Sequence, residues 1–219
     1  MDRSLRLTED GTHTLYVGEL DETYHSIRGA MQESMYVFIN EGFHKVPKKT
    51  IRILEIGLGT GLNLLLTLVE SLRYEMDVYY YAVEKYPLAP SEYSQLNFEK
   101  FIPGIPEGSL IKIHEALWEE DYSLTENFLI HKEQSDFRYM NPAEGFDLVY
   151  FDAFAPNKQP HLWSTLIFSQ LYDLMSPGGM LVSYTSKGIV RRALNSCGFE
   201  VKKLPGPPGK WEMIRATRR

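Results

Sequence analysis

Residues 51–61 read Ile51-Arg-Ile-Leu-Glu55-Ile-Gly57-Leu-Gly59-Thr-Gly61, and this stretch decides the fold. Its first six residues are mostly apolar, which predicts a buried strand over 51–56. Three glycines at alternate positions follow, and glycine permits both unusual backbone angles and a close approach of a ligand to the main chain. A pattern of apolar residues then predicts a helix over 62–73. The stretch therefore predicts a strand, a ligand-binding turn and a helix.

The ligand of this turn is predicted to contain adenosine without being NAD. A dinucleotide-binding loop places its third glycine where this chain has Leu62. A second apolar strand, over 78–83, ends at Glu84, 23 residues after Gly61. A carboxylate there can accept hydrogen bonds from both ribose hydroxyls. Since any tight turn can contain glycines, and acids at strand ends are common, the loop and Glu84 favour an adenosine-type ligand only together.

Strands and helices alternate along the rest of the chain. Outward from the glycine turn we expect a hairpin around Asp10-Gly11 with strands over 5–7 and 15–17, helices over 30–39, 91–98, 162–175 and 188–197, strands over 110–113, 146–151 and 180–184, a turn at 176–179, and a final antiparallel pair over 199–204 and 211–217. No element is predicted within 118–145. The alternation predicts an α/β fold with a parallel sheet covered on both faces and a ligand at the carboxyl ends of the strands.

Composition excludes several classes of protein. The chain has 219 residues, of which 43% are apolar and 24% charged, as in one soluble globular domain. The single cysteine, Cys197, excludes an intrachain disulfide and fits the cytoplasm. The six histidines are scattered, so no metal site is expected. No apolar run is long enough to cross a membrane, and the N-terminus does not resemble a secretion signal.

The charge is distributed unevenly. Residues 185–219 carry nine Lys or Arg and two acidic residues, while the whole chain has a net charge of −6. A basic segment on an acidic body can bind phosphates. A solvated strand and helix edge explains the same charges, so both interpretations remain open.

Asp152 follows the strand over 146–151 and begins the run Asp152-Ala-Phe154-Ala-Pro156-Asn-Lys158. A carboxylate at this edge of the sheet can orient an amine and take its proton, which leaves a lone pair free to attack. Pro156 stiffens the loop, and Phe154 can stack on a base. The alternative is an acid that only caps the turn after its strand.

Several motifs resemble known families. Glu55 and the three glycines form the ExGxGxG pattern, which is similar to the loop of class I S-adenosylmethionine-dependent methyltransferases. Five longer stretches resemble the methyltransferase domain of the tRNA 5-methylaminomethyl-2-thiouridine biosynthesis family (MnmC) and its single-domain, MnmD-like relatives. These stretches are Glu33-Ser-Met-Tyr36-Val-Phe38-Ile, residues 55–63, Glu84-Lys-Tyr-Pro87, residues 151–158 with Pro160 and Trp163, and Thr185-Ser-Lys-Gly-Ile-Val-Arg-Arg192. Residues 206–213 match more loosely.

The resemblance implies a Rossmann-like class I methyltransferase fold with an N-terminal β-hairpin extension. Residues 1–45 would form the extension, a hairpin and a short helix packed on the main domain, and residues 46–219 the methyltransferase domain. The implied reaction transfers a methyl group from S-adenosylmethionine to the amine of 5-aminomethyluridine, often 2-thiolated, at the wobble position of tRNA. The product is 5-methylaminomethyl(-2-thio)uridine.

The resemblance also implies roles for individual residues. Asp152 lies at the catalytic centre. The cofactor is held by Glu55, Gly57, Gly59, Gly61, Asn63 and Glu84. The tRNA is contacted by Phe154, Pro156, Lys158, Arg191, Arg192 and Lys210. Glu33 and Tyr36 either cover the cofactor or serve as a helix-surface acid and a core tyrosine.

Three departures from the family pattern affect these expectations. Relatives place Gly-Asp after the third strand, where the Asp contacts the adenine amino group, whereas this chain has Glu115-Ala116 after 110–113. We therefore expect Glu115 to compensate as a cofactor ligand. Trp211 stands where an Arg is expected, which weakens phosphate binding there. The flavin oxidase domain of the bifunctional members is not seen in this chain, so it is expected to methylate only, without flavin.

Two other functions share the predicted fold. A small-molecule methyltransferase or aminopropyltransferase would turn over polyamines and lack affinity for tRNA. A non-catalytic RNA-binding protein would not bind S-adenosylmethionine.

Overall fold

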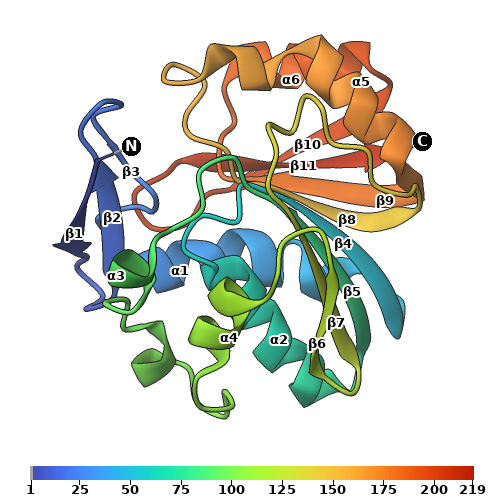
Figure 1. Ribbon diagram of the computed structural model, residues 1–219. Coiled ribbons are helices and arrows are strands. Elements are labelled where there is room, and N and C mark those ends of the chain that lie inside the picture. Colours follow the sequence, from blue (N-terminus) through green and yellow to red (C-terminus); the bar gives the residue numbers. More distant parts are fainter. Residues whose placement is uncertain (1) are drawn as a thin grey trace.

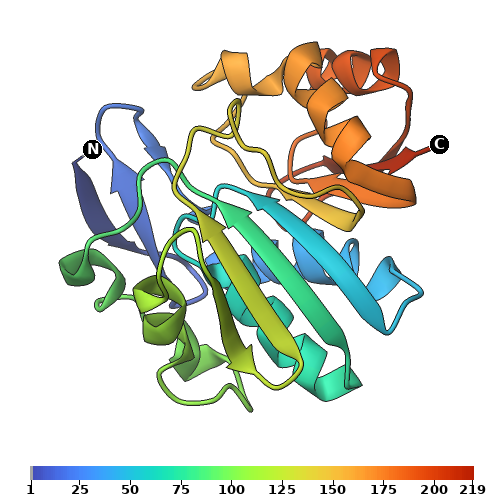
Figure 2. The same ribbon diagram turned by 45° about the vertical axis from the view of Figure 1, so that its right-hand side comes forward.

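An eight-stranded sheet forms the centre of the computed structural model, which describes residues 2–219 (Figures 1 and 2). In spatial order its strands are β10 (Phe199–Pro205), β11 (Glu212–Arg218), β9 (Met175–Ser183), β8 (Phe146–Phe151), β4 (Thr50–Ile56), β5 (Asp77–Val83), β7 (Phe128–Glu133) and β6 (Asp121–Thr125). The five strands from β9 to β7 pair in parallel, and the edges add antiparallel partners. This order confirms the α/β fold with a parallel sheet predicted from the alternating elements, and the class I methyltransferase fold that the resemblance implies.

Helices cover both faces of this sheet. Figure 1 shows α5 (Thr165–Leu174) and α6 (Gly188–Ser196) on one face, and α1 (Ala30–Ser34), α2 (Leu62–Tyr74) and α4 (Ser109–Glu115) on the other. The helix of α1 continues as a π-helical turn to Asn40, so it spans the segment predicted over 30–39. Because both faces are covered, β4 and β8 are buried almost throughout, which is why their sequences are mostly apolar.

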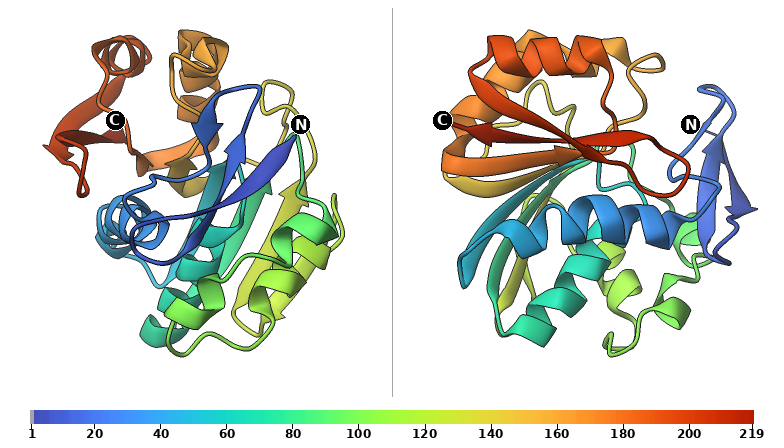
Figure 3. Two further views of the ribbon diagram at one scale, coloured as in Figure 1. Left: turned by 90° about the vertical axis from the view of Figure 1, so that its left-hand side faces the viewer. Right: turned by 180° about the vertical axis from the view of Figure 1, so that it is seen from behind.

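A second, three-stranded antiparallel sheet lies at the N-terminus, built from β1 (Arg3–Leu7), β2 (His13–Val17) and β3 (Glu22–Thr23) (Figure 3, left). It contains the predicted hairpin. Asn97 ties the sheet to the rest of the chain, since its Oδ1 accepts from His13 N at 2.8 Å and its Nδ2 donates to the Gly11 carbonyl. The boundary between residues 45 and 46 stays a prediction.

The prediction of a strand over 110–113 is wrong, because these residues form α4. Leu110 and Ile113 are both buried and three positions apart, so they lie on the same face of a helix, whereas in a strand they would point to opposite faces. The strand that pairs with β5 on the side away from β4 is β7. It comes from the stretch 118–145, for which no element was predicted. Its alternating burial, with Phe128, Ile130 and Lys132 inward, is the pattern of a strand.

The helix predicted over 91–98 is shorter than expected. It is α3 (Pro90–Tyr93), and a 3-10 turn follows over Phe98–Phe101. Asn97 lies between the two and is held by the N-terminal sheet, so a tertiary contact overrides the local helical pattern. The predicted turn at 176–179 lies inside β9, where the pairing with β8 shifts register. None of the helices within residues 2–219 is long and apolar enough to span a membrane.

Candidate active site

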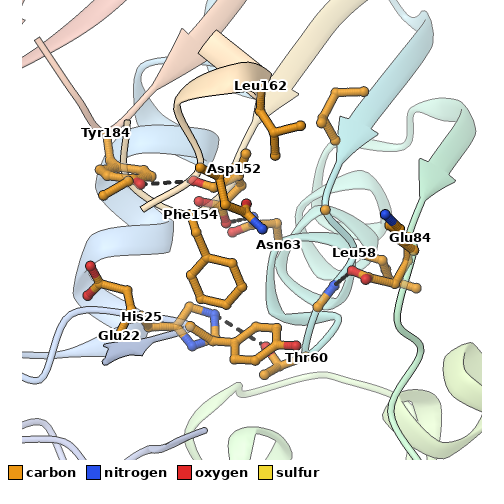
Figure 4. Close-up of a pocket in the computed structure, with 18 of the residues that line it drawn as sticks. Glu22, His25, Leu58, Thr60, Asn63, Glu84, Asp152, Phe154, Leu162 and Tyr184 are labelled. Atoms are coloured by element: carbon orange, nitrogen blue, oxygen red, sulfur yellow. Dashed lines mark hydrogen bonds between the residues drawn. The ribbon is translucent and has the colours of Figure 1, made fainter. Parts of the chain in front are cut away.

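A cavity of about 550 Å³ opens at the carboxyl ends of β4, β5 and β8. The glycine turn, the residues after β5, β7 and β8, residues 22–27 of the N-terminal segment, and Lys210 from the β10–β11 loop form its walls. In Figure 4, Glu84 and Leu58 lie at one end and Tyr184 and Glu22 at the other, with Asn63, Asp152 and Phe154 between them. The cavity therefore has two chemically different ends.

The glycine turn adopts a backbone that other residues resist. Gly57, Gly59 and Gly61 have φ of +90°, +52° and +77°. A Cβ on Gly57 would lie 3.1 Å from the Asp152 carbonyl oxygen, and a Cβ on Gly59 would lie 2.8 Å from the Tyr24 ring. Glycine therefore permits both these backbone angles and the close approach of the Asp152 carbonyl and the Tyr24 ring. Gly61 begins α2 and lies outside the cavity lining.

Glu84 supports this turn directly. Its Oε2 accepts a hydrogen bond from Gly59 N at 2.9 Å, and its Oε1 accepts one from Tyr86 N at 2.7 Å. Each carboxylate oxygen has a further lone pair, so Glu84 can still accept from ribose hydroxyls. The structure thus brings Gly57, Gly59 and Glu84 together at one end of the cavity, as the motif predicted.

Asn63 links two carboxyl groups at the middle of the cavity. Its Nδ2 donates to Glu55 Oε1 and to Asp152 Oδ2, each at 2.9 Å. Glu55 is fully buried behind the lining, and this burial raises its pKa well above the usual value. Burial also raises the pKa of Asp152, to about 7, and the nearby Glu33 carboxylate adds to the effect. Asp152 can therefore exchange a proton near neutral pH.

Aromatic side chains extend from the glycine turn to the other end of the cavity. The Tyr24 ring packs against Gly59, and Phe154, in the middle of the cavity, meets this ring edge to face at a centroid distance of 5.0 Å. The Tyr184 hydroxyl donates to the Ala153 carbonyl at 2.9 Å, which fixes the ring beside Asp152. Sequence reasoning identified Phe154 but missed Tyr24 and Tyr184, because no local motif relates them to the turn after β8. These rings can enclose a planar group.

Lys210 lies inside this end of the cavity. Its ammonium forms an ion pair with Glu33 from α1 and lies 3.9 Å from the centre of the Tyr184 ring. Lys210, predicted to contact the tRNA, thus lies in the cavity wall and is paired with Glu33. The sequence showed the charge of Lys210, but its partner is 177 residues away along the chain.

The other predicted tRNA contacts lie outside the lining. Pro156 is buried, and Lys158 Nζ lies 3.9 Å from Asp21. Arg192 is exposed on α6 and Arg191 is partly buried there. Lys187, just before α6, donates to Asn157 Oδ1 at 2.9 Å. This bond places the start of α6 beside the 152–158 segment, so its bases border the cavity without entering it.

The predicted role of Glu115 is contradicted. Glu115 ends α4, is exposed, and is not part of the cavity wall. Asp136 lies in the wall instead, after β7 and beside Glu84 and Lys85, and its carboxylate is held by Lys85 and Arg138. The error follows from the wrong third strand: the acid was sought after 110–113, whereas Ser135-Asp136 follows the strand that pairs with β5.

Thr60 in the glycine turn is held from two sides by histidines that the motifs did not indicate. His25 Nε2 lies 3.2 Å from Thr60 Oγ1, and His114 Nε2 lies 3.0 Å from the Thr60 carbonyl oxygen. Burial lowers the pKa of both imidazoles to about 4, so they are neutral at physiological pH. Within residues 2–219, no three His, Cys, Asp or Glu side chains cluster in a way that could hold a metal ion.

Comparisons with known proteins agree with this geometry. Residues 125–219 match the sequence model of a family described as S-adenosyl-L-methionine-dependent methyltransferase. Over 91% of its length the chain is 31% identical to the tRNA 5-methylaminomethyl-2-thiouridine biosynthesis bifunctional protein MnmC of Pseudomonas savastanoi pv. phaseolicola, of which it covers 32%. The chain thus spans about a third of the length of this curated relative.

Solved structures support the same similarity. The crystal structure of MNMC2 from Aquifex aeolicus superposes with a TM-score of 0.83 at 27% identity, covering 100% of this chain and 70% of that one. Spermidine synthase from Thermotoga maritima superposes with a TM-score of 0.58 at 13% identity, over 100% of this chain and 72% of that one, which shows a shared fold. The resemblance to the MnmC family, the methyltransferase fold and the S-adenosylmethionine cofactor predicted from the motifs are confirmed by these comparisons.

Proposed function

From the premise that the chain has the fold and motifs of S-adenosylmethionine-dependent methyltransferases, we propose that it methylates the amine of 5-aminomethyl(-2-thio)uridine at the tRNA wobble position. The product is 5-methylaminomethyl(-2-thio)uridine. The observation that carries the proposal is Asp152, whose pKa of about 7 suits a group that takes a proton from an amine. It lies between the glycine turn and the aromatic end of one cavity.

The glycine-turn end of the cavity fits S-adenosylmethionine. Gly57 and Gly59 hold the turn in left-handed backbone conformations, and Glu84 retains lone pairs for ribose hydroxyls. Asn63 Oδ1 is buried and has no hydrogen-bond partner in the described part of the chain, so it can accept from the methionine ammonium. Asp136, farther along the same wall, replaces Glu115 as the proposed contact to adenine. When bound, the cofactor supplies an electrophilic methyl group.

Asp152 would act on the acceptor amine. An aminomethyl group is largely protonated near neutral pH, and only its neutral form is nucleophilic. The ionised Asp152 would orient the ammonium and take one proton, which would leave the nitrogen lone pair free to accept the methyl group that the bound cofactor would supply. Asn63 holds the Asp152 carboxylate at 2.9 Å throughout. The aromatic rings of Phe154 and Tyr184 would enclose the uracil.

The basic segment beside the cavity supports a tRNA substrate. Lys187, Arg191 and Arg192 lie around the first turns of α6, next to the 152–158 segment, and Lys158 lies within that segment. Such bases can contact phosphates of a polyanion that the net charge of −6 would otherwise repel. We place the reaction in the cytoplasm, in keeping with the single cysteine. No metal or flavin is needed for the proposed transfer.

The direct test is methyl transfer to bulk tRNA from a strain that lacks this modification. With S-adenosylmethionine, the protein should convert 5-aminomethyluridine nucleosides to their monomethyl form, detected by mass spectrometry of digested tRNA. Polyamines offered in parallel, with S-adenosylmethionine or its decarboxylated form, test the small-molecule alternative. Turnover of polyamines with no change in tRNA would replace the proposed function by that alternative.

Changing Lys187, Arg191 and Arg192 together to alanine should weaken tRNA binding while leaving S-adenosylmethionine affinity unchanged. Up to three phosphate contacts are lost, so the log–log salt dependence of tRNA binding should flatten by about two to three units, at about 0.7–0.9 per contact. Filter binding over a salt series measures this slope. A matched triple variant at Lys45, Lys49 and Lys112, exposed and outside the cavity wall, should keep the wild-type slope. Equal slopes for both triple variants would place the RNA surface elsewhere.

A further inference from the structure

An ion pair closes the aromatic end of the cavity. Lys210, in the loop between β10 and β11, meets Glu33 of α1, and Glu33 Oε2 accepts a further bond from Ser26 N at 2.9 Å. Figure 3 (right) shows this loop reaching the N-terminal part of the chain. The Glu33 side chain is 10% exposed and that of Lys210 is 32% exposed. Both residues line the cavity.

The pair has unused hydrogen-bonding capacity. A carboxylate offers about four lone-pair sites, and Glu33 uses two of them, for Lys210 and for Ser26 N. A lysine ammonium has three protons, and Lys210 gives one to Glu33. The neighbouring Tyr184 hydroxyl is bonded to the Ala153 carbonyl and does not compete. The cavity wall therefore presents a cationic donor and an anionic acceptor side by side.

This arrangement matches one edge of uracil. In uracil the O4 acceptor lies next to the N3–H donor, whereas in cytosine the N4 amino donor lies next to the N3 acceptor. Enzymes that act on an extruded base read it by hydrogen bonds to this edge and by stacking on aromatic side chains. We propose that Lys210 and Glu33 read the acceptor base, with Lys210 donating to O4 and Glu33 accepting from N3–H. The inference rests on the proposed uridine substrate.

The position of the reacting amine agrees with this assignment. The aminomethyl group is attached to C5, adjacent to the C4 carbonyl, so a base held at O4 by Lys210 directs its amine to the same side. The charges of both Glu33 and Lys210 act on Asp152, so the pair lies close to the group that takes the proton from the amine. The C2 position lies beyond N3 and is not contacted by Lys210. The pair therefore selects uracil over cytosine and accepts oxygen or sulfur at C2.

The experiment uses synthetic anticodon stem-loops that carry 5-aminomethyluridine or 5-aminomethylcytidine at the wobble position. Wild type should methylate the uridine substrate with the higher kcat/KM. Lys210→Met should lower kcat/KM for the uridine substrate by about ten- to a hundredfold, the range of one lost base contact, and thereby remove most of the discrimination. Glu33→Gln should reduce the discrimination because an amide can also donate to N3 of cytosine.

Matched variants separate base reading from general effects. Lys202→Met removes an exposed lysine of β10 that pairs with Glu200. Glu41→Gln removes a carboxylate that pairs with Arg215; Glu41 lies at the end of the helical segment that contains Glu33. Both should keep wild-type discrimination. S-adenosylmethionine affinity, measured by calorimetry, should be unchanged in all four variants. If Lys210→Met is inactive on both stem-loops, Lys210→Arg should restore the preference for uridine because it retains the donor.

The outcomes distinguish this inference from the function on which it rests. A wild-type protein that methylates neither stem-loop and no tRNA overturns the proposed function. A wild-type protein that prefers uridine, with the same preference in Lys210→Met and Glu33→Gln, overturns only the base-reading role. A loss of S-adenosylmethionine affinity equal to the loss of kcat/KM also overturns it, because the pair would then only shape the cavity.

Discussion

Asp152→Asn is expected to lower turnover by about two orders of magnitude or more at neutral pH, the usual size of a positioned acid–base contribution. The asparagine can still accept a hydrogen bond from Asn63, so the cavity should keep its shape and most of its S-adenosylmethionine affinity. It cannot take a proton from the acceptor amine. Single-turnover methyl transfer to tRNA, with cofactor binding measured separately, checks this expectation.

The pH dependence of the same variant has a definite sign. Burial holds the pKa of Asp152 at about 7, so wild-type turnover should rise as pH increases through 7 and Asp152 ionises. In Asp152→Asn this rise should disappear, and turnover should follow only the deprotonation of the amine, with partial recovery at alkaline pH. A profile that keeps the rise near pH 7 in the variant would assign the proton transfer to another group.

Stability provides a control for this variant. The folded-state pKa of Asp152 lies above its usual value, so its contribution to stability decreases as pH rises toward 7 and the buried carboxylate ionises. At pH 8 the asparagine variant should therefore be at least as stable as wild type in thermal unfolding. Asp173→Asn, an exposed acid of α5, should change neither turnover nor its pH profile. Wild-type turnover in Asp152→Asn would reduce Asp152 to a cap of its turn.

Gly59→Val is expected to lower S-adenosylmethionine affinity by about a hundredfold. Gly59 has φ of +52°, and a Cβ there would lie 2.8 Å from the Tyr24 ring. Backbone strain of this kind costs about 1–3 kcal/mol, and the side chain also occupies space over the turn. The turn would shift and carry Gly59 N away from Glu84. Isothermal titration calorimetry measures the affinity.

A second glycine provides the matched control. Gly104 has φ of +82°, and a Cβ there would meet no atom within 4 Å. Gly104→Val therefore introduces similar backbone strain in open space, and it should lower stability while keeping cofactor affinity. Equal affinities for wild type and Gly59→Val would remove the glycine turn from the cofactor site.

Local sequence was sufficient to predict the strand, turn and helix of residues 51–73, because periodicity and glycine spacing act within one short segment. Asp152 was found for the same reason, since it follows a strand that is apolar except for Asp147. Asp136 was missed because β7 is half polar and buries Lys132, which donates to the His114 carbonyl at 2.8 Å. A buried lysine hides the alternation that would have revealed the strand.

Contacts between segments that are far apart in the chain could not be predicted from local sequence. Lys210 was interpreted from its charge, and nothing near it indicates Glu33. Tyr24 and Tyr184 likewise reach the cavity from opposite ends of the chain. These residues become neighbours only through the order of strands in the sheet, which the composition of each segment does not specify.

The separation of Glu33 and Lys210 along the chain also affects how the protein is made. Synthesis proceeds from the N-terminus, so the glycine turn, Glu84 and Asp152 are available before the β10–β11 hairpin exists. The cofactor end can thus assemble early, whereas the acceptor end is completed only once residues 199–218 have been translated. Until then β9 is an edge strand that pairs only with β8, and its free edge invites association with other chains. The hairpin that completes the acceptor pocket is therefore also the element that protects a newly made chain from aggregation.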